Sequence, residues 1–84
     1  MTKNILVTGS SRGIGLVIAK GLSAAGYNLF ITSRNEDLLI KNSEEIGAKA
    51  FCVCDLACEN DLKNLSIFIE KNSIDVLITN AGEY

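Results

Sequence analysis

The chain has 84 residues, of which 48% are hydrophobic and 21% charged, so it suits one small globular unit and excludes a disordered segment. Its net charge is −2, and its eight Lys and Arg residues are scattered rather than clustered, which argues against a nucleic-acid-binding surface. We find no secretory signal and no apolar run long enough to span a membrane, and therefore expect a cytoplasmic protein with no membrane partner.

Short apolar runs and helical patterns alternate along the chain. Asn35 suits the N-cap of one helix, and Gly26 and Gly47 suit the left-handed positions that end helices. The expected elements, in chain order, are strand 5–8, helix 13–25, strand 27–32, helix 36–46, strand 49–54, helix 59–72 and strand 75–79.

The third strand, 49–54, is a continuous apolar run, which is typical of a parallel strand that is covered on both faces. Cys52 and Cys54 alternate with Val53 and so point to one face, where we expect small buried side chains. Together with Cys58 they lack a fourth ligand and any histidine, so no metal site is expected. Three cysteines within seven positions also do not form a disulfide framework, which fits a reducing compartment.

In the third helix, Leu62, Leu65, Phe68 and Ile69 recur at helical spacing and predict its inner face. Its charged residues, Asp61 among them, are interpreted as a solvated outer face.

This alternation predicts an α/β fold: a parallel sheet with right-handed crossovers and helices on both faces. The expected strand order is 3-2-1-4, within a single domain that takes in residues 1–84. In such sheets ligands bind beyond the carboxyl ends of the strands, where the strand order reverses, which here is between the first and fourth strands.

The loop between the first strand and the first helix reads Thr-Gly-Ser-Ser-Arg-Gly-Ile-Gly over residues 8–15. Gly9 suits a tight turn, Gly13 lets a diphosphate approach the backbone, and Gly15 lets the helix lie close to the strand. The unpaired amide groups of a helix's first turn attract phosphate oxygens. The loop residues Ser11, Arg12 and Ile14 would lie against the same ligand, so the sequence predicts a dinucleotide site.

In its wording, this loop resembles the short-chain dehydrogenase/reductase family, and within it the 3-oxoacyl carrier-protein reductases. The segment Asn80-Ala81-Gly82 matches three of four residues of the family's Asn-Asn-Ala-Gly motif, with Thr79 in the first place. The resemblance implies a Rossmann-type fold of order βαβαβαβ, of which this chain is the N-terminal cofactor-binding part. It also implies that Asp55 hydrogen-bonds the adenine amino group and that Leu56 packs beside the ring. A turn-capping role for Asp55 is the alternative, and both roles are compatible.

The end of the second strand indicates which dinucleotide is bound. NAD-binding sites place an acidic residue about 20 residues after the glycine loop, whereas Ser33 and Arg34 occupy this place here. Without the carboxylate, and with Arg34 and Arg12 able to grip a 2′-phosphate, we expect NADP(H) to be preferred over NAD(H). In the alternative, the arginines are solvated and Glu36 or Asp37 holds the ribose.

The family's catalytic Ser and Tyr-x-x-x-Lys do not occur in this chain, since Tyr27 is followed by Ile31 four residues later and Tyr84 is the last residue. We therefore expect no catalytic residue here and no activity of these 84 residues alone. In the complete protein the resemblance implies hydride transfer between NADP(H) and a small carbonyl substrate, and a homo-oligomer. A non-catalytic nucleotide-binding or regulatory module is the alternative function.

Overall fold

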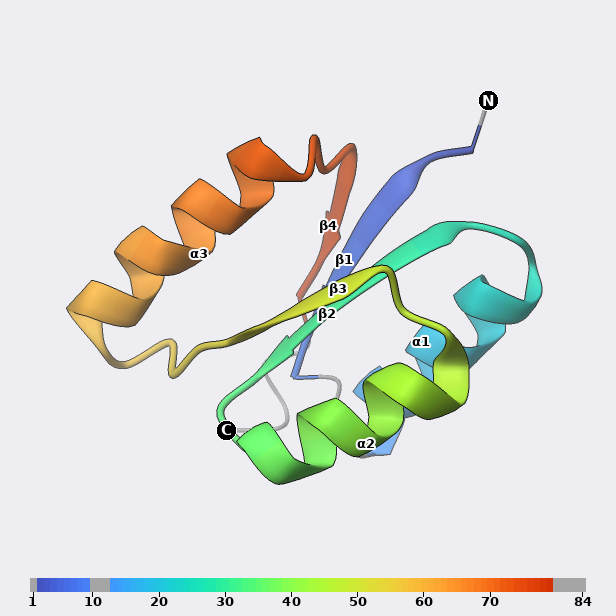
Figure 1. The fold of residues 1–84 in the computed structure, drawn as a ribbon, viewed down its shortest axis with the longest axis horizontal. Helices are drawn as coiled ribbons and strands as arrows, with labels where there is room; N and C mark the ends of the chain where they lie inside the picture. Colours follow the sequence, from blue (N-terminus) through green and yellow to red (C-terminus); the bar gives the residue numbers. More distant parts are fainter. Residues whose placement is uncertain (1, 10–12, 80–84) are drawn as a thin grey trace.

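The computed structural model describes residues 2–9 and 13–79 (Figure 1). Strands and helices alternate in the predicted order, each boundary lying within two residues of the expected one. The elements are β1 (Asn4–Thr8), α1 (Gly13–Ala24), β2 (Asn28–Ser33), α2 (Glu36–Ile46), β3 (Ala50–Val53), α3 (Glu59–Lys71) and β4 (Val76–Ile78).

The four strands form one parallel sheet in the order β3-β2-β1-β4. Leu6 of β1 lies opposite Phe30 of β2 on one side and Leu77 of β4 on the other. Helix α3 covers one face of the sheet, while α1 and α2 cover the other (Figure 1). The predicted α/β fold and strand order are confirmed, including the reversal between β1 and β4.

Each face of the sheet has its own apolar cluster, because alternate strand residues point to opposite faces. Between the sheet and α1 and α2, the buried members of the cluster are Ile5, Val7, Ala19, Leu29, Ile31, Leu39 and Ile46. Under α3 they are Leu6, Phe30, Cys54 and Leu65. Phe30 and Phe68 meet edge to face, with ring centroids 6.2 Å apart. The sheet is thus held from both sides, which fixes the positions at which its strands end.

The helix ends follow local chemistry. The side-chain oxygen of Asn35 accepts a hydrogen bond from the amide of Leu38 at 3.1 Å and caps α2. Gly26 and Gly47 have φ angles of +94° and +69°, as predicted for the residues that end α1 and α2. None of the helices in the described parts of the chain is both long and apolar enough to cross a bilayer.

Two expectations about the burial of apolar side chains are wrong. Strand β3 lies at an edge of the sheet, so Phe51 and Val53 are 37% and 38% exposed rather than covered. Leu62 is 44% exposed, since α3 turns only Leu65, Phe68 and Ile69 toward the sheet.

Candidate functional site

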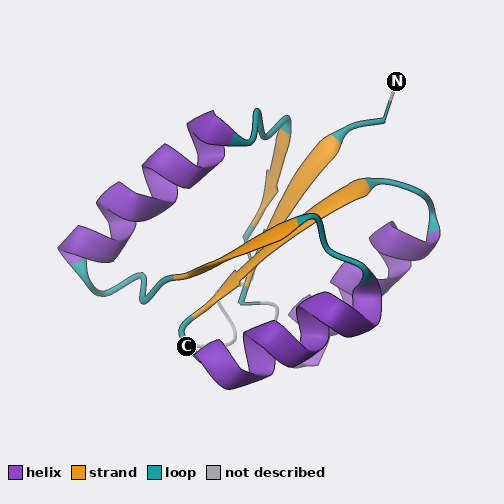
Figure 2. Ribbon diagram, in the orientation of Figure 1, coloured by secondary structure: helices purple, strands orange, loops and turns teal. Residues whose placement is uncertain are grey.

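The carboxyl ends of all four strands lie at one edge of the sheet, and each helix begins beside this edge (Figure 2). β1 and β4 are neighbours, with Val7 opposite Ile78, so the carboxyl ends of these two strands lie side by side. This edge is where the predicted ligand-binding residues are expected. Asn80, Ala81 and Gly82, predicted to follow β4, lie outside the described residues.

Two glycines bound the loop between β1 and α1. Gly9, directly after β1, has a φ of +63°, and Gly13, the first residue of α1, has a φ of +66°. A residue with a side chain is strained in this left-handed region. A Cβ on Gly13 would meet no heavy atom of the described residues within 4 Å, so the space above the backbone is open on their side. Ser11 and Arg12 of the same loop lie outside the described residues.

Helix α1 begins with bare backbone. Gly15 is buried, while Ile14 is 71% exposed beside it. The amide groups of the first turn have no partner within the helix and carry its positive partial charge. This part of the site fits the diphosphate of a dinucleotide, since the open space at Gly13 lies beside amides that have no partner within the helix.

The end of β2 brings Ser33 and Arg34 to the same edge. Ser33 is 3% exposed, and its hydroxyl accepts a hydrogen bond from the amide of Asn35 at 3.3 Å. Arg34 is exposed, between this buried serine and the N-cap of α2. The backbone thus turns sharply after β2 and presents the arginine at the surface of the edge.

After β3, the chain forms a compact turn around Asp55. One carboxylate oxygen of Asp55, Oδ1, accepts a hydrogen bond from the amide of Ala57 at 2.9 Å, and its carbonyl accepts one from the amide of Cys58 at 2.9 Å. The predicted turn-capping role is therefore confirmed. Leu56 packs against the apolar cluster under α3 and is half-buried.

Asp61 also belongs to this turn, and the prediction that it lies on the solvated face of α3 is wrong. It is half-buried rather than solvated, and its Oδ2 accepts a hydrogen bond from the amide of Asp55 at 3.0 Å. A Ser or Thr cap followed three residues later by an acid is the usual signal for such a contact. Here Cys58 occupies the cap and makes no side-chain capping bond, so this signal is missing.

The cysteines under α3 are free thiols. Cys54 is 1% exposed, and burial, with smaller contributions from Cys52 and nearby carboxylates, raises its pKa to about 11. Burial and then the charge of Asp61 raise the pKa of Cys52 as well. Cys54 therefore stays protonated at neutral pH and donates to the carbonyl of Asp61 at 3.6 Å. The described residues contain no cluster of three or more potential metal ligands.

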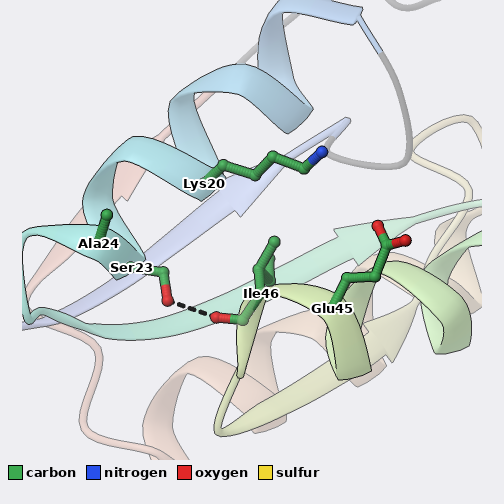
Figure 3. A pocket seen from close by; sticks show the side chains of 5 residues that line it. All are labelled: Lys20, Ser23, Ala24, Glu45 and Ile46. Atoms are coloured by element: carbon green, nitrogen blue, oxygen red, sulfur yellow. Dashed lines mark hydrogen bonds between the residues drawn. The ribbon is translucent and has the colours of Figure 1, made fainter.

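A hollow of about 500 Å³ lies elsewhere, between the last turns of α1 and α2 (Figure 3). Lys20, Ser23 and Ala24 line it from α1, and Glu45 and Ile46 from α2. The Ser23 hydroxyl donates a hydrogen bond to the carbonyl of Ile46 and ties the two helices together. None of the predicted binding residues lines this hollow.

The fold agrees with the comparison with known proteins. The short chain dehydrogenase family model matches residues 3–84. The chain belongs to this family.

Two curated relatives illustrate the similarity. Carbonyl reductase family member 4 of Xenopus laevis is 37% identical over 84 residues, which is 98% of this chain and 36% of the relative. The 3-oxoacyl-(acyl-carrier-protein) reductase of rhamnolipid biosynthesis from Pseudomonas aeruginosa is 37% identical over 82 residues, 92% of this chain and 32% of the relative. The chain thus spans about a third of the length of these relatives.

Solved structures agree in fold. A Pseudomonas aeruginosa RhlG/NADP active-site complex superposes with a TM-score of 0.83 at 32% identity, over 94% of this chain and 34% of the other. An actinorhodin polyketide ketoreductase variant with NADPH gives a TM-score of 0.82 at 32% identity, over 95% and 33% of the two chains. The first of these structures is a complex with NADP and the second contains NADPH.

Proposed function

We propose that this chain is the cofactor-binding part of an oxidoreductase that transfers a hydride between NADP(H) and a carbonyl or hydroxyl substrate. The observation that carries the proposal is the pair of left-handed glycines, Gly9 and Gly13, which bound the loop at the point where the strand order reverses. Membership of a dehydrogenase family supports the same activity.

In this proposal the diphosphate lies against the first turn of α1. Gly13 leaves the backbone open there, and the amide groups of the first turn supply hydrogen-bond donors. Ser11 and Arg12 would contact it from the loop, with Ile14 and Gly15 below it.

The adenosine end lies across the ends of β2 and β3. Among the described residues, nothing donates a hydrogen bond to the second carboxylate oxygen of Asp55, so this oxygen is available to the adenine amino group. Leu56 packs beside the ring. The backbone of the turn is fixed by its own hydrogen bonds, which favours a defined pocket over a flexible loop.

We propose a preference for the 2′-phosphorylated cofactor. Arg34 is exposed beside the end of β2, where an NAD-binding site has a carboxylate. Its guanidinium group carries a fixed positive charge and binds phosphate with two parallel hydrogen bonds. The NADPH and NADP ligands of two similar structures support this preference.

For the complete protein, we propose a 3-oxoacyl thioester or a related small carbonyl compound as substrate, supported by the names of several relatives. Asn80, Ala81 and Gly82 would line the ribose next to the nicotinamide. We further propose a cytoplasmic homo-oligomer whose proton-transfer residues lie outside these 84 residues, which by themselves do not reduce a carbonyl.

Calorimetric titration with nucleotide halves tests the proposal, since the chain supplies mainly the adenosine side. We expect the wild-type chain to bind 2′,5′-ADP more tightly than 5′-AMP. Arg34→Ala should reduce this ratio by about tenfold or more, because it removes the charge-assisted hydrogen bonds to the phosphate. Lys41→Ala removes a cation from the second turn of α2, the helix that follows Arg34, and should leave the ratio unchanged.

Absence of binding to both nucleotides by the folded wild-type chain would overturn the proposed function. Equal ratios for wild type and Arg34→Ala would overturn only the role of Arg34 in selecting the cofactor.

A further inference from the structure

We infer that Asp61 is a positioning residue of the adenine pocket: its carboxylate holds the backbone of Asp55 so that the Asp55 side chain faces the nucleotide. This inference rests on the proposed function and adds a residue to the site. Asp61 does not itself contact the ligand and acts through the turn after β3.

The side chain of Asp61 contacts the backbone of Asp55. Asp61 Oδ2 accepts the hydrogen bond of the Asp55 amide at 3.0 Å, although Asp61 belongs to the first turn of α3. An acid at this helical position ordinarily turns back to the amide of the cap residue. Here the amide of the cap residue, Cys58, donates instead to the Asp55 carbonyl at 2.9 Å. Asp61 therefore reaches past the cap to the residue that begins the turn.

This contact is one of three hydrogen bonds that fix the conformation of Asp55. Its amide is bound by Asp61, its carbonyl by Cys58 and its Oδ1 by the amide of Ala57 at 2.9 Å. Three bonds thus fix both the backbone and the side-chain rotation of Asp55. Its Oδ2 has no hydrogen-bond donor within the described chain and is the atom left for a ligand.

Cys54 connects the turn with the end of β2. The amide of Cys54 donates to the carbonyl of Ser33 at 2.9 Å, and its thiol donates to the carbonyl of Asp61 at 3.6 Å. Asp61 is therefore fixed by its main chain to the residue beneath it and by its side chain to Asp55. Since Ser33 precedes Arg34, the same connection relates the adenine side to the phosphate side of the proposed pocket.

An acidic residue in the first turn of a helix also stabilises the helix through its charge. Loss of this charge is a competing explanation for any effect of removing Asp61. Glu59 offers a matched control for this effect. It lies in the same first turn and is exposed, and no described residue hydrogen-bonds to its side chain. Removal of Glu59 changes the charge at the helix end but leaves the Asp55 amide bound.

The experiment measures the affinities of the folded chain for 5′-AMP and for inorganic diphosphate by calorimetry. Inorganic diphosphate has no adenine and so tests the glycine loop alone. Asp61→Ala should weaken 5′-AMP binding about threefold to tenfold, the usual range for one net hydrogen bond, and leave diphosphate binding unchanged. Asp61→Asn retains an acceptor oxygen of the same reach and should restore 5′-AMP binding to within about twofold, and Glu59→Ala should do likewise. If Asp61→Ala does not fold, Asp61→Ser, which is too short to reach Asp55, replaces it with the same expectation.

A purely structural role would lower the stability of Asp61→Ala without changing the ratio of the two affinities. If the wild type binds both ligands and this ratio is the same in Asp61→Ala, or if Glu59→Ala lowers it equally, the inference is wrong and the proposed function stands. If the folded wild type binds neither ligand, both are overturned.

Discussion

Asn4 and Asp75, 71 positions apart in the sequence, exchange two hydrogen bonds of 2.8 Å. The Asn4 amide donates to the Asp75 carboxylate, and the Asp75 amide donates to the Asn4 carbonyl. The Asn4 side chain also donates to the carbonyls of Asn72 and Ser73 at 3.1 Å and accepts from the Asn28 side chain at 3.0 Å. One residue at the amino edge thus joins β1 to β2 and to the start of β4, and so sets where these strands end at the opposite edge.

Asn4→Ala should therefore be costly for a residue near the chain surface. It removes three side-chain hydrogen bonds, and we expect a loss of about 2 kcal/mol in the free energy of unfolding in urea. Asp75→Ala removes one acceptor and should cost about 1 kcal/mol. Asn64→Ala, at an exposed position of α3, is the control and should stay within about 0.5 kcal/mol of wild type. A loss for Asn4→Ala no larger than that of Asn64→Ala would show that the hydrogen bonds do not hold β4.

Gly13 and Gly21 form a pair that isolates the effect of backbone conformation. At either position an added Cβ meets no heavy atom within 4 Å among residues 2–9 and 13–79. Gly13 has a φ of +66°, whereas Gly21 lies inside helix α1. Gly13→Ala should lower the free energy of unfolding by about 1–2 kcal/mol. Gly21→Ala should raise it by about 0.5–1 kcal/mol, because alanine favours the helix and restricts the unfolded chain. Urea unfolding of both variants decides the matter, and effects of the same sign would contradict the left-handed conformation of Gly13.

The fold could be predicted from sequence because its signals are local. Short apolar runs predict the strands, and Asn35, Gly26 and Gly47 predict the helix ends. The observed geometry of these three residues confirms their predicted roles. The strand order followed from the alternation of strands and helices, since right-handed crossovers leave few arrangements. The same strand order places the glycine loop at the reversal of the sheet.

Features that depend on the meeting of distant segments could not be predicted in this way. The apolar run of β3 does not reveal that its outer side lies at an edge, where Phe51 and Val53 are partly exposed. Asp61 has the spacing of a solvated helical residue, and only the return of the β3–α3 turn brings the Asp55 amide to its carboxylate. The predicted ligand contacts of Gly9, Ser33, Arg34 and Asp55 remain predictions.

The N-cap of α2 gives a third test. Asn35→Ala removes the bond from the Leu38 amide to the Asn35 side chain and should cost about 1 kcal/mol of stability. Asn35→Ser keeps a capping oxygen and should lie within a few tenths of a kcal/mol of wild type, because serine and asparagine cap about equally well. Thermal or urea unfolding of the two variants measures the difference. Equal losses for Ala and Ser would mean that the side-chain oxygen does not cap the helix.

Cys54 makes the free energy of unfolding depend on pH in the alkaline range. Its folded pKa of about 11 lies above the ordinary value of 9.0, so the folded state keeps a proton that the unfolded state loses first. The contribution is therefore fully present below pH about 9 and is lost as the pH rises to about 11. Urea unfolding between pH 8 and 11 should show a steeper decline for wild type than for Cys54→Ala, whatever the Lys and Tyr residues contribute to both. Cys58→Ala is the matched control, because Cys58 is only partly buried whereas Cys54 is buried. This variant should retain the wild-type slope. Identical slopes for wild type and Cys54→Ala would mean that the thiol does not ionise differently in the two states.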